Sequence, residues 1–212
     1  MGNRIILDKM SPEIQYLCQN DVFLCNIINK IGILEYDIND NPYEFLVHEI
    51  IEQMLSQKAG CKIFQRLVNL CNGNISPEVI AELSDEDIKS IGTSNSKVSY
   101  IRNITNAVLS QDINFNDLYD MDDNEVFKKL TSIKGVGKWT ANMYLIFVLN
   151  RKDILPTNDA AFLQAYKWLY RTDDVSEKSI REKCKIWKPY SSIAARYLYI
   201  ALDTGLVKKK DD

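Results

Sequence analysis

The chain has 212 residues, of which 46% are hydrophobic, while only 8 are glycine and 5 are proline. This length and composition are typical of a globular protein with a buried core, and they exclude a disordered chain or a small disulfide scaffold. The longest unbroken apolar run, from Met143 to Leu149, has seven residues, whereas a membrane-spanning helix needs about 20. We therefore expect no membrane association and, because the N-terminus lacks a secretory signal, a cytoplasmic protein.

The charge of the chain is unevenly distributed along its length. The net charge is −3, yet residues 124–171 contain eight basic and three acidic side chains, which gives this window +5 and leaves −8 elsewhere. An acidic average argues against a protein that coats nucleic acid without selectivity, but a local positive field can still serve one binding surface. The local charge of this window is therefore more informative than the average over the chain.

Cysteine and histidine are too few and too scattered for the usual metal sites. The single histidine, His48, excludes a site built from several histidines, and no Cys-x-x-Cys pair is present. We expect no metal site, and chemistry that depends on carboxylates. Core thiols rather than disulfides are predicted for the five cysteines, Cys18, Cys25, Cys61, Cys71 and Cys184.

Helix-start signals dominate the first half of the chain. A serine or asparagine followed by proline predicts helices that begin at Pro12, Pro42 and Pro77. The only short extended piece is expected between residues 31 and 38, where apolar and polar residues alternate. The fold class is therefore predicted to be all-α.

Apolar residues recur at intervals of three and four from Phe45 to Leu55, which predicts a helix with one buried face. Glu44, Glu49 and Glu52 lie off that face in this pattern. A second periodic run follows from Ile63 to Leu70. Two further helices are expected, at residues 85–91 and 98–109.

Residues 123–150 carry the most specific pattern, which predicts a helix, a hairpin and a second helix. Gly135 and Gly137 flank a small apolar residue, so the backbone can turn sharply and the second helix can open with its amide groups directed outward. Such a helix terminus attracts phosphate, and Lys134 and Lys138 flank it. From spacing alone, an ordinary glycine turn between packed helices remains the alternative.

Four ordered motifs give this chain a family resemblance over about residues 42–204. They are residues 53–59 (QMLSQKA), 133–142 (IKGVGKWTAN), 153–159 (DILPTND) and 187–191 (WKPYS). Together they resemble the helix-hairpin-helix DNA glycosylases of the HhH-GPD superfamily, and within it the alkylation-repair branch of 3-methyladenine DNA glycosylases. The resemblance implies a monofunctional glycosylase of base excision repair. Such an enzyme flips alkylated, cationic purines such as 3-methyladenine out of double-stranded DNA and hydrolyses their N-glycosidic bond.

The resemblance also implies a single two-lobed domain over residues 1–212, with the active site in the cleft between the lobes. One lobe would combine about residues 1–49 with 155–212, and the other would span about 50–154, including the helix-hairpin-helix at 123–150. We expect a monomer without a cofactor. Only Cys184 lies near the C-terminus, whereas the iron–sulfur loop of another branch needs four cysteines there.

Asp159 is the residue that matches the catalytic aspartate of this family. A carboxylate beneath the sugar would stabilise the positive charge that develops when an N-glycosidic bond breaks. Asp159 also stands where a helix N-cap is expected, and the two roles are compatible. Asp153 is expected to cap a helix or to pair with Arg151 or Lys152.

Aromatic side chains are expected to bind the flipped base. In relatives that also cut the strand, a nucleophilic lysine stands where this chain has Trp139, so the resemblance implies no lyase activity. Trp139 and Tyr190 match pocket aromatics, and Tyr144 is a further candidate. Stacking on a cationic base gains cation-π energy of roughly 0.5 to 2 kcal/mol per ring. Core packing is the alternative for each ring.

The remaining DNA contacts are expected around the hairpin and at the end of the helix over residues 45–55. Met54 matches the wedge that fills the gap left by the flipped base, with Leu55 as the alternative. Backbone carbonyls around Ile133, Gly135 and Val136 are implied to hold a monovalent cation. The predicted phosphate contacts are Lys134, Gly135, Val136, Gly137, Lys138 and Thr140.

Two other functions remain open at this point. A glycosylase for another lesion, such as 8-oxoguanine, would share the fold and the aspartate but usually carries the lyase lysine that Trp139 replaces. A non-catalytic DNA-binding module would use the hairpin alone and would need neither Asp159 nor the aromatic pair.

Overall fold

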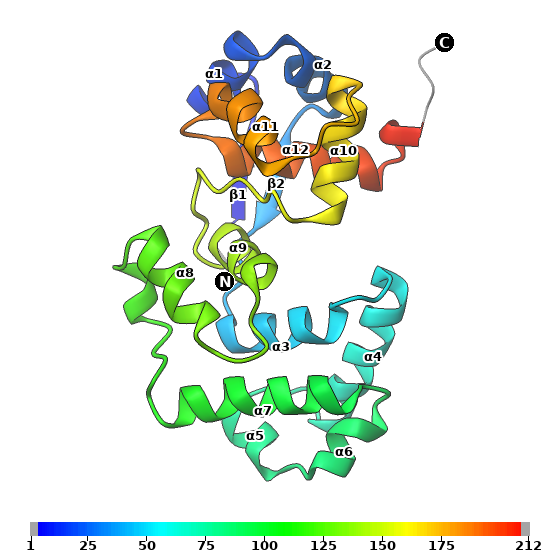
Figure 1. The fold of residues 1–212 in the computed structure, drawn as a ribbon, viewed down its shortest axis with the longest axis vertical. Helices are drawn as coiled ribbons and strands as arrows, with labels where there is room; N and C mark the ends of the chain where they lie inside the picture. The colour runs from blue at the N-terminus through cyan, green and yellow to red at the C-terminus, as the bar shows by residue number, and fades with distance from the viewer. Residues whose placement is uncertain (1–3, 209–212) are drawn as a thin grey trace. The chain divides into compact units, whose positions relative to one another are not determined.

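The structure is a computed structural model that describes residues 4–208, and it is predominantly helical (Figure 1). The chain forms two compact units. The first unit combines the chain up to Ile38 with the chain from Asn150 onward, and the second spans Asn39–Leu149. The all-α prediction is confirmed. Among the described helices, none is long and apolar enough to span a membrane.

The first unit contains both strands of the described chain and helices from both ends of the sequence. Its elements are β1 (Arg4–Leu7), α1 (Pro12–Asn20), α2 (Val22–Ile31), β2 (Leu34–Asp37), α10 (Ala160–Tyr170), α11 (Glu177–Lys183), the 3-10 turn η2 (Cys184–Trp187), α12 (Ser191–Asp203) and the 3-10 turn η3 (Leu206–Lys208). β1 and β2 pair antiparallel, with Arg4 opposite Asp37.

The second unit is one continuous stretch of chain that contains the predicted hairpin. Its elements are α3 (Pro42–Glu52), α4 (Gln57–Leu70), α5 (Pro77–Glu82), α6 (Asp85–Ser90), α7 (Asn95–Leu109), the 3-10 turn η1 (Asp117–Tyr119), α8 (Asp123–Thr131) and α9 (Lys138–Phe147).

Helix α12 forms the centre of the first unit and packs against α2 and α10. Its side chains Ala194, Tyr197 and Leu198 are completely buried. Asp21, only 3% exposed, caps α2 by accepting hydrogen bonds from the backbone of α2. It also accepts one from Trp187 Nε1 at 2.8 Å. This buried carboxylate therefore ties the N-terminal helices to the C-terminal part of the chain.

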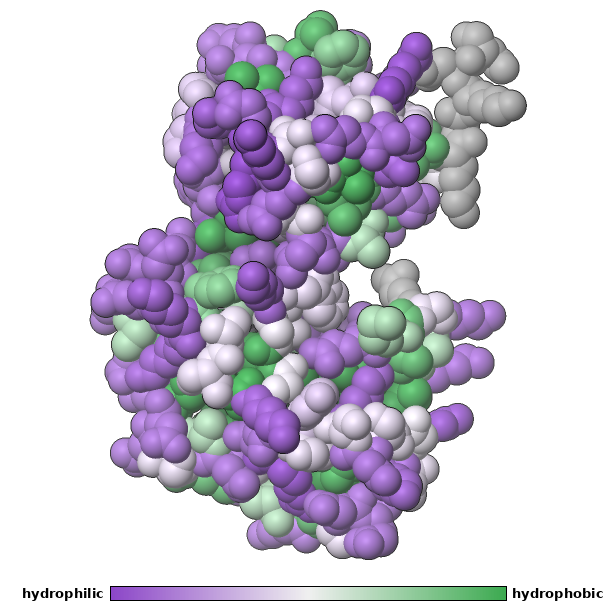
Figure 2. Space-filling view, in the orientation of Figure 1, coloured by the Kyte–Doolittle hydropathy of each residue, from purple (hydrophilic) through white to green (hydrophobic). Residues whose placement is uncertain are grey.

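Helix α7 is the long central element of the second unit. It packs against α3, α5 and α6 (Figure 1). Ile101 and Ile104 on α7 and Leu46 and Ile50 on α3 are completely buried. Hydrophilic side chains cover most of the face of the molecule shown in Figure 2, as the apolar-in, polar-out patterning of the helices requires.

Most of the predicted element boundaries agree with the structure. The helices at Pro12, Pro42 and Pro77 begin at those residues. Strand β2 lies within the predicted extended piece at 31–38. Strand β1 was not predicted, because four residues, three of them consecutive apolar ones, carry no recognisable alternation.

The predicted helix over residues 45–55 ends earlier than expected, at Glu52. Met54 therefore leaves the buried face: it has φ 59° and its side chain is fully exposed. Leu55 is 41% exposed. Glu49, expected off the buried face, is instead buried at 9% exposure. Periodicity alone missed both departures, because it cannot show where the chain leaves the helix or which neighbour covers a flank.

The cysteine prediction holds only in part. All five cysteines are free thiols, and Cys71 and Cys184 are buried. Cys18 and Cys25 are partly buried, but Cys61 is exposed on α4, so the prediction of a core thiol is wrong for Cys61.

The two units divide the chain at 38/39 and 149/150, whereas the sequence placed the lobe boundaries at about 49/50 and 154/155. The predicted first boundary falls inside α3. This helix stays whole because it packs along its length against α4, α7 and α9 of the second unit.

Candidate active site and nucleic-acid interface

The hairpin between α8 and α9 depends on Gly135. Its φ is 111°, a value that side-chain-bearing residues rarely adopt, and a Cβ atom at this position would lie 2.4 Å from Tyr100 Cγ. Tyr100 belongs to α7. The backbone of the hairpin can therefore approach α7 this closely only because residue 135 is a glycine.

Side chains from α7 and from the end of α3 hold the hairpin in place. Asn103 Nδ2 donates a hydrogen bond to the Lys134 carbonyl at 2.9 Å. Gln53 Nε2 donates to the Gly135 carbonyl at 3.1 Å and to Thr140 Oγ1 at 3.3 Å. The hairpin is thus fixed to two helices of its own unit.

Two residues predicted to contact DNA have buried side chains. Thr140 is 1% exposed, and its hydroxyl accepts the hydrogen bond from Gln53. Val136 is 4% exposed. These side chains position the hairpin from within, and the DNA contact of the two residues stays a prediction. Only their backbone groups remain candidates for phosphate contact.

The start of α9 differs from most helix starts of the described chain. Most of the other α-helices begin with a serine, asparagine or aspartate side chain that accepts a backbone N–H, whereas α9 begins at Gly137 with no side-chain cap. Lys134 and Lys138 are both exposed beside it. A helix N-terminus flanked by two exposed lysines is suited to binding a phosphate group.

The loop between α3 and α4, residues 53–56, presents Met54 to solvent. Lys97 Nζ on α7 donates to the carbonyls of Ile51 at 2.7 Å and of Gln53 at 2.8 Å. These contacts end α3 with a cation on its last carbonyls. The exposed side chain and the left-handed backbone of Met54 do not themselves stabilise the unit. The loop therefore depends on the contacts of Lys97 to keep its conformation.

Asp159 lies in the first unit, at the N-cap of α10. Its Oδ1 accepts a hydrogen bond from the Phe162 amide at 2.6 Å, and its own amide donates to the Pro156 carbonyl at 3.0 Å. The side chain is 7% exposed. The predicted capping role is confirmed. A carboxylate in this position is held rigidly and is stabilised by the dipole of α10.

The segment that leads to Asp159 is bound to the start of α12. The Ser192 amide donates to the Lys152 carbonyl at 2.9 Å, and Ser192 Oγ accepts from the Ile154 amide at 2.9 Å. Ser191 Oγ donates to Asp153 Oδ1 at 2.5 Å. These bonds fix the backbone just before Asp159.

Asp153 pairs differently from the prediction. Its carboxylate lies 3.4 Å from Lys188 Nζ and accepts the hydrogen bond from Ser191. Lys152, expected as a partner of Asp153, instead pairs with Glu13 at 2.8 Å. The sequence could not reveal Glu13 or Lys188 as partners, because both are distant along the chain.

The three candidate pocket aromatics have different environments. Trp139 is partly buried at the start of α9, and Tyr190 is partly buried at the start of α12. Tyr190 makes an edge contact with Tyr16, with ring centroids 5.4 Å apart. Trp139 and Tyr190 each keep part of their surface exposed.

Tyr144, by contrast, is completely buried in the second unit. Its ring packs against Phe45 and Phe115, each with a centroid distance of 6.1 Å. Burial raises the pKa of Tyr144 above its usual value. The prediction of Tyr144 as a pocket residue is therefore wrong, because its ring faces are already covered by the core.

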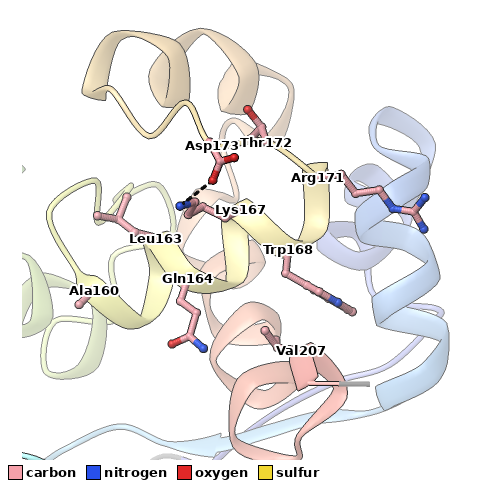
Figure 3. A pocket seen from close by; sticks show the side chains of 9 residues that line it. All are labelled: Ala160, Leu163, Gln164, Lys167, Trp168, Arg171, Thr172, Asp173 and Val207. Carbon is pink, nitrogen blue, oxygen red and sulfur yellow. Dashed lines mark ion pairs between the residues drawn. The ribbon is translucent and has the colours of Figure 1, made fainter. Parts of the chain in front are cut away.

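A shallow surface hollow lies along α10 in the first unit (Figure 3). Lys167 and Asp173, which both line the hollow, form an ion pair at 2.9 Å. Neither Asp159 nor Tyr190 lines the hollow, so it is distinct from the predicted base pocket. Its lining residues are Ala160, Leu163, Gln164, Lys167, Trp168, Arg171, Thr172, Asp173 and Val207.

The carbonyls expected to hold a monovalent cation are largely committed to the protein. The Ile133 carbonyl accepts from the Val136 amide at 3.0 Å, and the Gly135 carbonyl accepts from Gln53. A carbonyl oxygen with one hydrogen bond keeps a second lone pair, so the cation site at these carbonyls stays a prediction.

Sequence reasoning missed the residues that support the site. Gln53 was present in a recognised motif, but its contact with the hairpin spans 82 positions. Lys97, Tyr100 and Asn103 lie on one helix, α7, and carried no signal beyond helical periodicity.

The chain is similar to proteins of one family along most of its length. The family model of the HhH-GPD superfamily base excision DNA repair proteins matches residues 47–189. DNA-3-methyladenine glycosylase 1 of Schizosaccharomyces pombe is 32% identical over 162 residues, which cover 74% of this chain and 71% of that protein.

Solved structures agree with this sequence similarity. The DNA-3-methyladenine glycosidase of Bacillus halodurans is 34% identical with a TM-score of 0.82, covering 95% of this chain and 94% of its own. A 3-methyladenine DNA glycosylase of Schizosaccharomyces pombe, solved in complex with abasic DNA, is 28% identical with a TM-score of 0.82, covering 94% of this chain and 100% of its own. The chain therefore belongs to the HhH-GPD superfamily of base excision DNA repair proteins.

Proposed function

We propose that this protein is an alkyl-base DNA glycosylase of base excision repair, which hydrolyses the N-glycosidic bond of cationic purines such as 3-methyladenine in double-stranded DNA. The observation that carries the proposal is the buried Asp159 carboxylate, held by the α10 amide of Phe162 in a chain of this family. The relatives named 3-methyladenine glycosylases favour an alkylated base as substrate over an oxidised one.

Asp159 would act on the sugar rather than on the base. As the bond between C1′ and the purine nitrogen breaks, its electron pair leaves with the base and positive charge develops on the sugar. A fixed carboxylate stabilises that charge without having to reorganise. Water then attacks C1′ and loses a proton to solvent, which leaves an abasic site and a free base. The hydrogen bond at 2.6 Å from the Phe162 amide supplies this fixed orientation.

Trp139 and Tyr190 would recognise the base by its charge. A purine alkylated on a ring nitrogen is cationic, so an aromatic face attracts it more strongly than it attracts a normal base. The same positive charge makes the purine a good leaving group. Selectivity would then need few hydrogen bonds to the base edge, and several alkylated purines would serve as substrates.

Trp139 also bears on the type of reaction. An indole cannot form the Schiff base through which bifunctional relatives cut the DNA strand. Lys138 is one position away, but it lies exposed at the start of α9, beside the expected phosphate position. We therefore propose that the enzyme is monofunctional.

The second unit would bind and deform the duplex. The N-terminus of α9, with Lys134 and Lys138, would bind the phosphate backbone of the duplex. The net positive charge of residues 124–171 favours this contact. Met54 would enter the stack in place of the flipped nucleotide, for which its full exposure and its anchored loop are suited.

The experiment that tests this function uses duplex DNA treated with a methylating agent. Wild-type protein is expected to release free methylated purines, and strand breaks are expected only after alkali treatment. Asp159→Asn serves as the matched control, because asparagine caps a helix as well as aspartate does. Strand cleavage without alkali would refute the monofunctional assignment, and release of 8-oxoguanine without release of methylated bases would refute the substrate class.

A further inference from the structure

Three potential metal ligands meet between α3 and α4, next to the loop that carries Met54. His48 and Glu52 are one turn apart on α3, and Cys61 lies in the first half of α4. One ligand atom from each residue lies within 4.8 Å of the other two. All three residues belong to the second unit, so their arrangement is internal to one compact body.

The distances around Glu52 Oε1 match a tetrahedral metal site. This oxygen lies 3.4 Å from His48 Nε2 and 3.6 Å from Cys61 Sγ. Around a tetrahedral Zn²⁺ with bonds of about 2.0 Å to nitrogen, 2.1 Å to oxygen and 2.3 Å to sulfur, N···O and S···O separations are about 3.4 Å and 3.6 Å. The two separations from Glu52 Oε1 are thus those expected between ligands of one ion. Rotation of the exposed Cys61 side chain can adjust the third separation, between Cys61 Sγ and His48 Nε2.

His48 is also oriented as a metal-bound histidine is. Its second ring nitrogen, Nδ1, lies 3.6 Å from Glu49 Oε1. Metal-bound histidines usually direct their other nitrogen to a carboxylate, a backbone carbonyl or water, and such a partner orients the ring. The ring is further held by an edge contact with Phe64 of α4, with centroids 4.5 Å apart.

Gly60 provides the space for this arrangement. A Cβ atom at residue 60 would lie 2.7 Å from Glu52 Cγ and 2.9 Å from Glu52 Oε1. A side chain at position 60 would therefore force the Glu52 side chain to shift away from this close approach of α4. That approach is what brings Cys61 within reach of the carboxylate.

We propose that His48, Glu52 and Cys61 bind a divalent transition metal, with Zn²⁺ as the best match, and that the ion holds the α3–α4 loop. Imidazole, carboxylate and thiolate together favour Zn²⁺ over Mg²⁺ or Ca²⁺, which prefer oxygen ligands. Water supplies the fourth ligand, since the Cys61 side of the site is exposed.

The ion has a structural role in this proposal. It joins the last turn of α3 to the first turns of α4, on the two sides of residues 53–56. Closing this short loop with a metal restricts the backbone that presents Met54. The proposal concerns binding and loop order, so it does not depend on the excision reaction.

Metal binding is tested directly with the purified full-length chain after chelation, by equilibrium dialysis against Zn²⁺ and by titration with Co²⁺. One ion per chain is expected, together with the thiolate-to-cobalt charge-transfer band. Cys61→Ser and His48→Gln should each weaken binding at least tenfold, and Cys61→Ser should also remove the band. Glu49→Gln should weaken binding about 10- to 100-fold, as is typical of partners that orient a ligand.

Cys25→Ser is the matched control, because Cys25 is a free thiol in the other unit and should leave binding unchanged. Circular dichroism shows that each variant is folded. Hydrogen exchange at residues 53–56 should slow when Zn²⁺ is added to the wild type and should not change in Cys61→Ser. Absence of stoichiometric binding by the wild type, or equal binding by Cys61→Ser, would overturn the proposal. Loss of binding in Cys25→Ser would do the same.

Discussion

The helices α9 and α10 begin in opposite ways, although both carry residues of the proposed site. Helix α10 begins at Asp159, whose carboxylate binds an amide of its own helix. Helix α9 begins at Gly137, which has no side chain to offer, and Lys138 is exposed beside it. One helix N-terminus thus holds an internal anion, and the other is suited to an external one.

The comparison shows how one feature of the backbone can serve two purposes. The N-terminal amides of a helix stabilise negative charge wherever it comes from. At α10 the charge is built into the chain and fixed in position, as the electrostatic role that we propose for Asp159 requires. At α9 no side chain caps the helix, and we propose that a phosphate group binds there. The residue at the N-cap decides whether the helix binds an anion of its own chain or an external one. Substitutions at the two N-caps, Asp159 and Gly137, therefore test the comparison.

The largest effect is expected from Asp159. Asp159→Asn and Asp159→Ala should both lower the rate of base excision by roughly 10²- to 10³-fold, as loss of an electrostatic stabiliser does. They should differ in stability: alanine costs about 1 kcal/mol of unfolding free energy because the cap is lost, while asparagine keeps it. Excision kinetics and thermal unfolding measure the two effects. Equal stability of the two variants would contradict the capping role, and full activity of Asp159→Asn would contradict the catalytic one.

The next effect concerns the hairpin that leads into α9. Gly135→Ala should destabilise the protein by about 1 to 3 kcal/mol and weaken DNA binding, because both the backbone angle and the Tyr100 contact oppose a side chain. Gly73→Ala is the control: Gly73 has φ 83° and open space around it, so only the backbone cost applies. Denaturant unfolding compares the two. Equal losses would show that the contact with Tyr100 does not matter.

A new cap on α9 should make it resemble α10. Gly137 has φ −87°, and a Cβ atom at this position would have no neighbouring atom within 4 Å, so a side chain fits there. Gly137→Asp should raise stability by a few tenths of a kcal/mol, yet lower duplex affinity about three- to tenfold at low salt. Gly137→Ser supplies a cap without charge and should lose less affinity. Unchanged affinity in Gly137→Asp, measured by fluorescence anisotropy, would show that phosphate does not bind at this terminus.

The smallest effect is expected from the lysines beside α9. Lys138→Ala and Lys134→Ala should each reduce the slope of log affinity against log salt by about 0.9, independent of DNA sequence. Lys89→Ala, an exposed lysine on α6, should leave the slope unchanged. Binding titrations at several salt concentrations measure these slopes. Equal slopes for all three variants would show that Lys134 and Lys138 do not contact the DNA.

Local signals predicted much of the fold and part of the site. Proline at the first helical position predicted the starts of α1, α3 and α5, because the geometry of proline acts within one turn of the chain. The position of Asp159 directly before a helix identified its capping role for the same reason. The burial of Tyr144 between Phe45 and Phe115 carried no comparable signal, since its partners come from other elements.

Residues that act across elements could be assigned only in the folded chain. The sequence did not indicate that Lys97 ends α3, or that Gln53 binds the hairpin. It also suggested no metal site, because His48 and Cys61 are 13 positions apart and match no ligand spacing in common use. Their proximity follows from the packing of α3 on α4 and from the space left at Gly60.

Asp159 and Trp139 became candidates through the resemblance to the glycosylase family, whereas the sequence by itself determined the helical class and the hairpin with its two glycines. These features depend on neighbours within a few residues, where backbone geometry and side-chain type suffice. The tertiary structure decided the end of α3 and the exposure of Met54. It also decided the covering of Tyr144 and the meeting of His48, Glu52 and Cys61. These depend on contacts between helices distant in the chain, because only packing determines which side chain covers, supports or completes another.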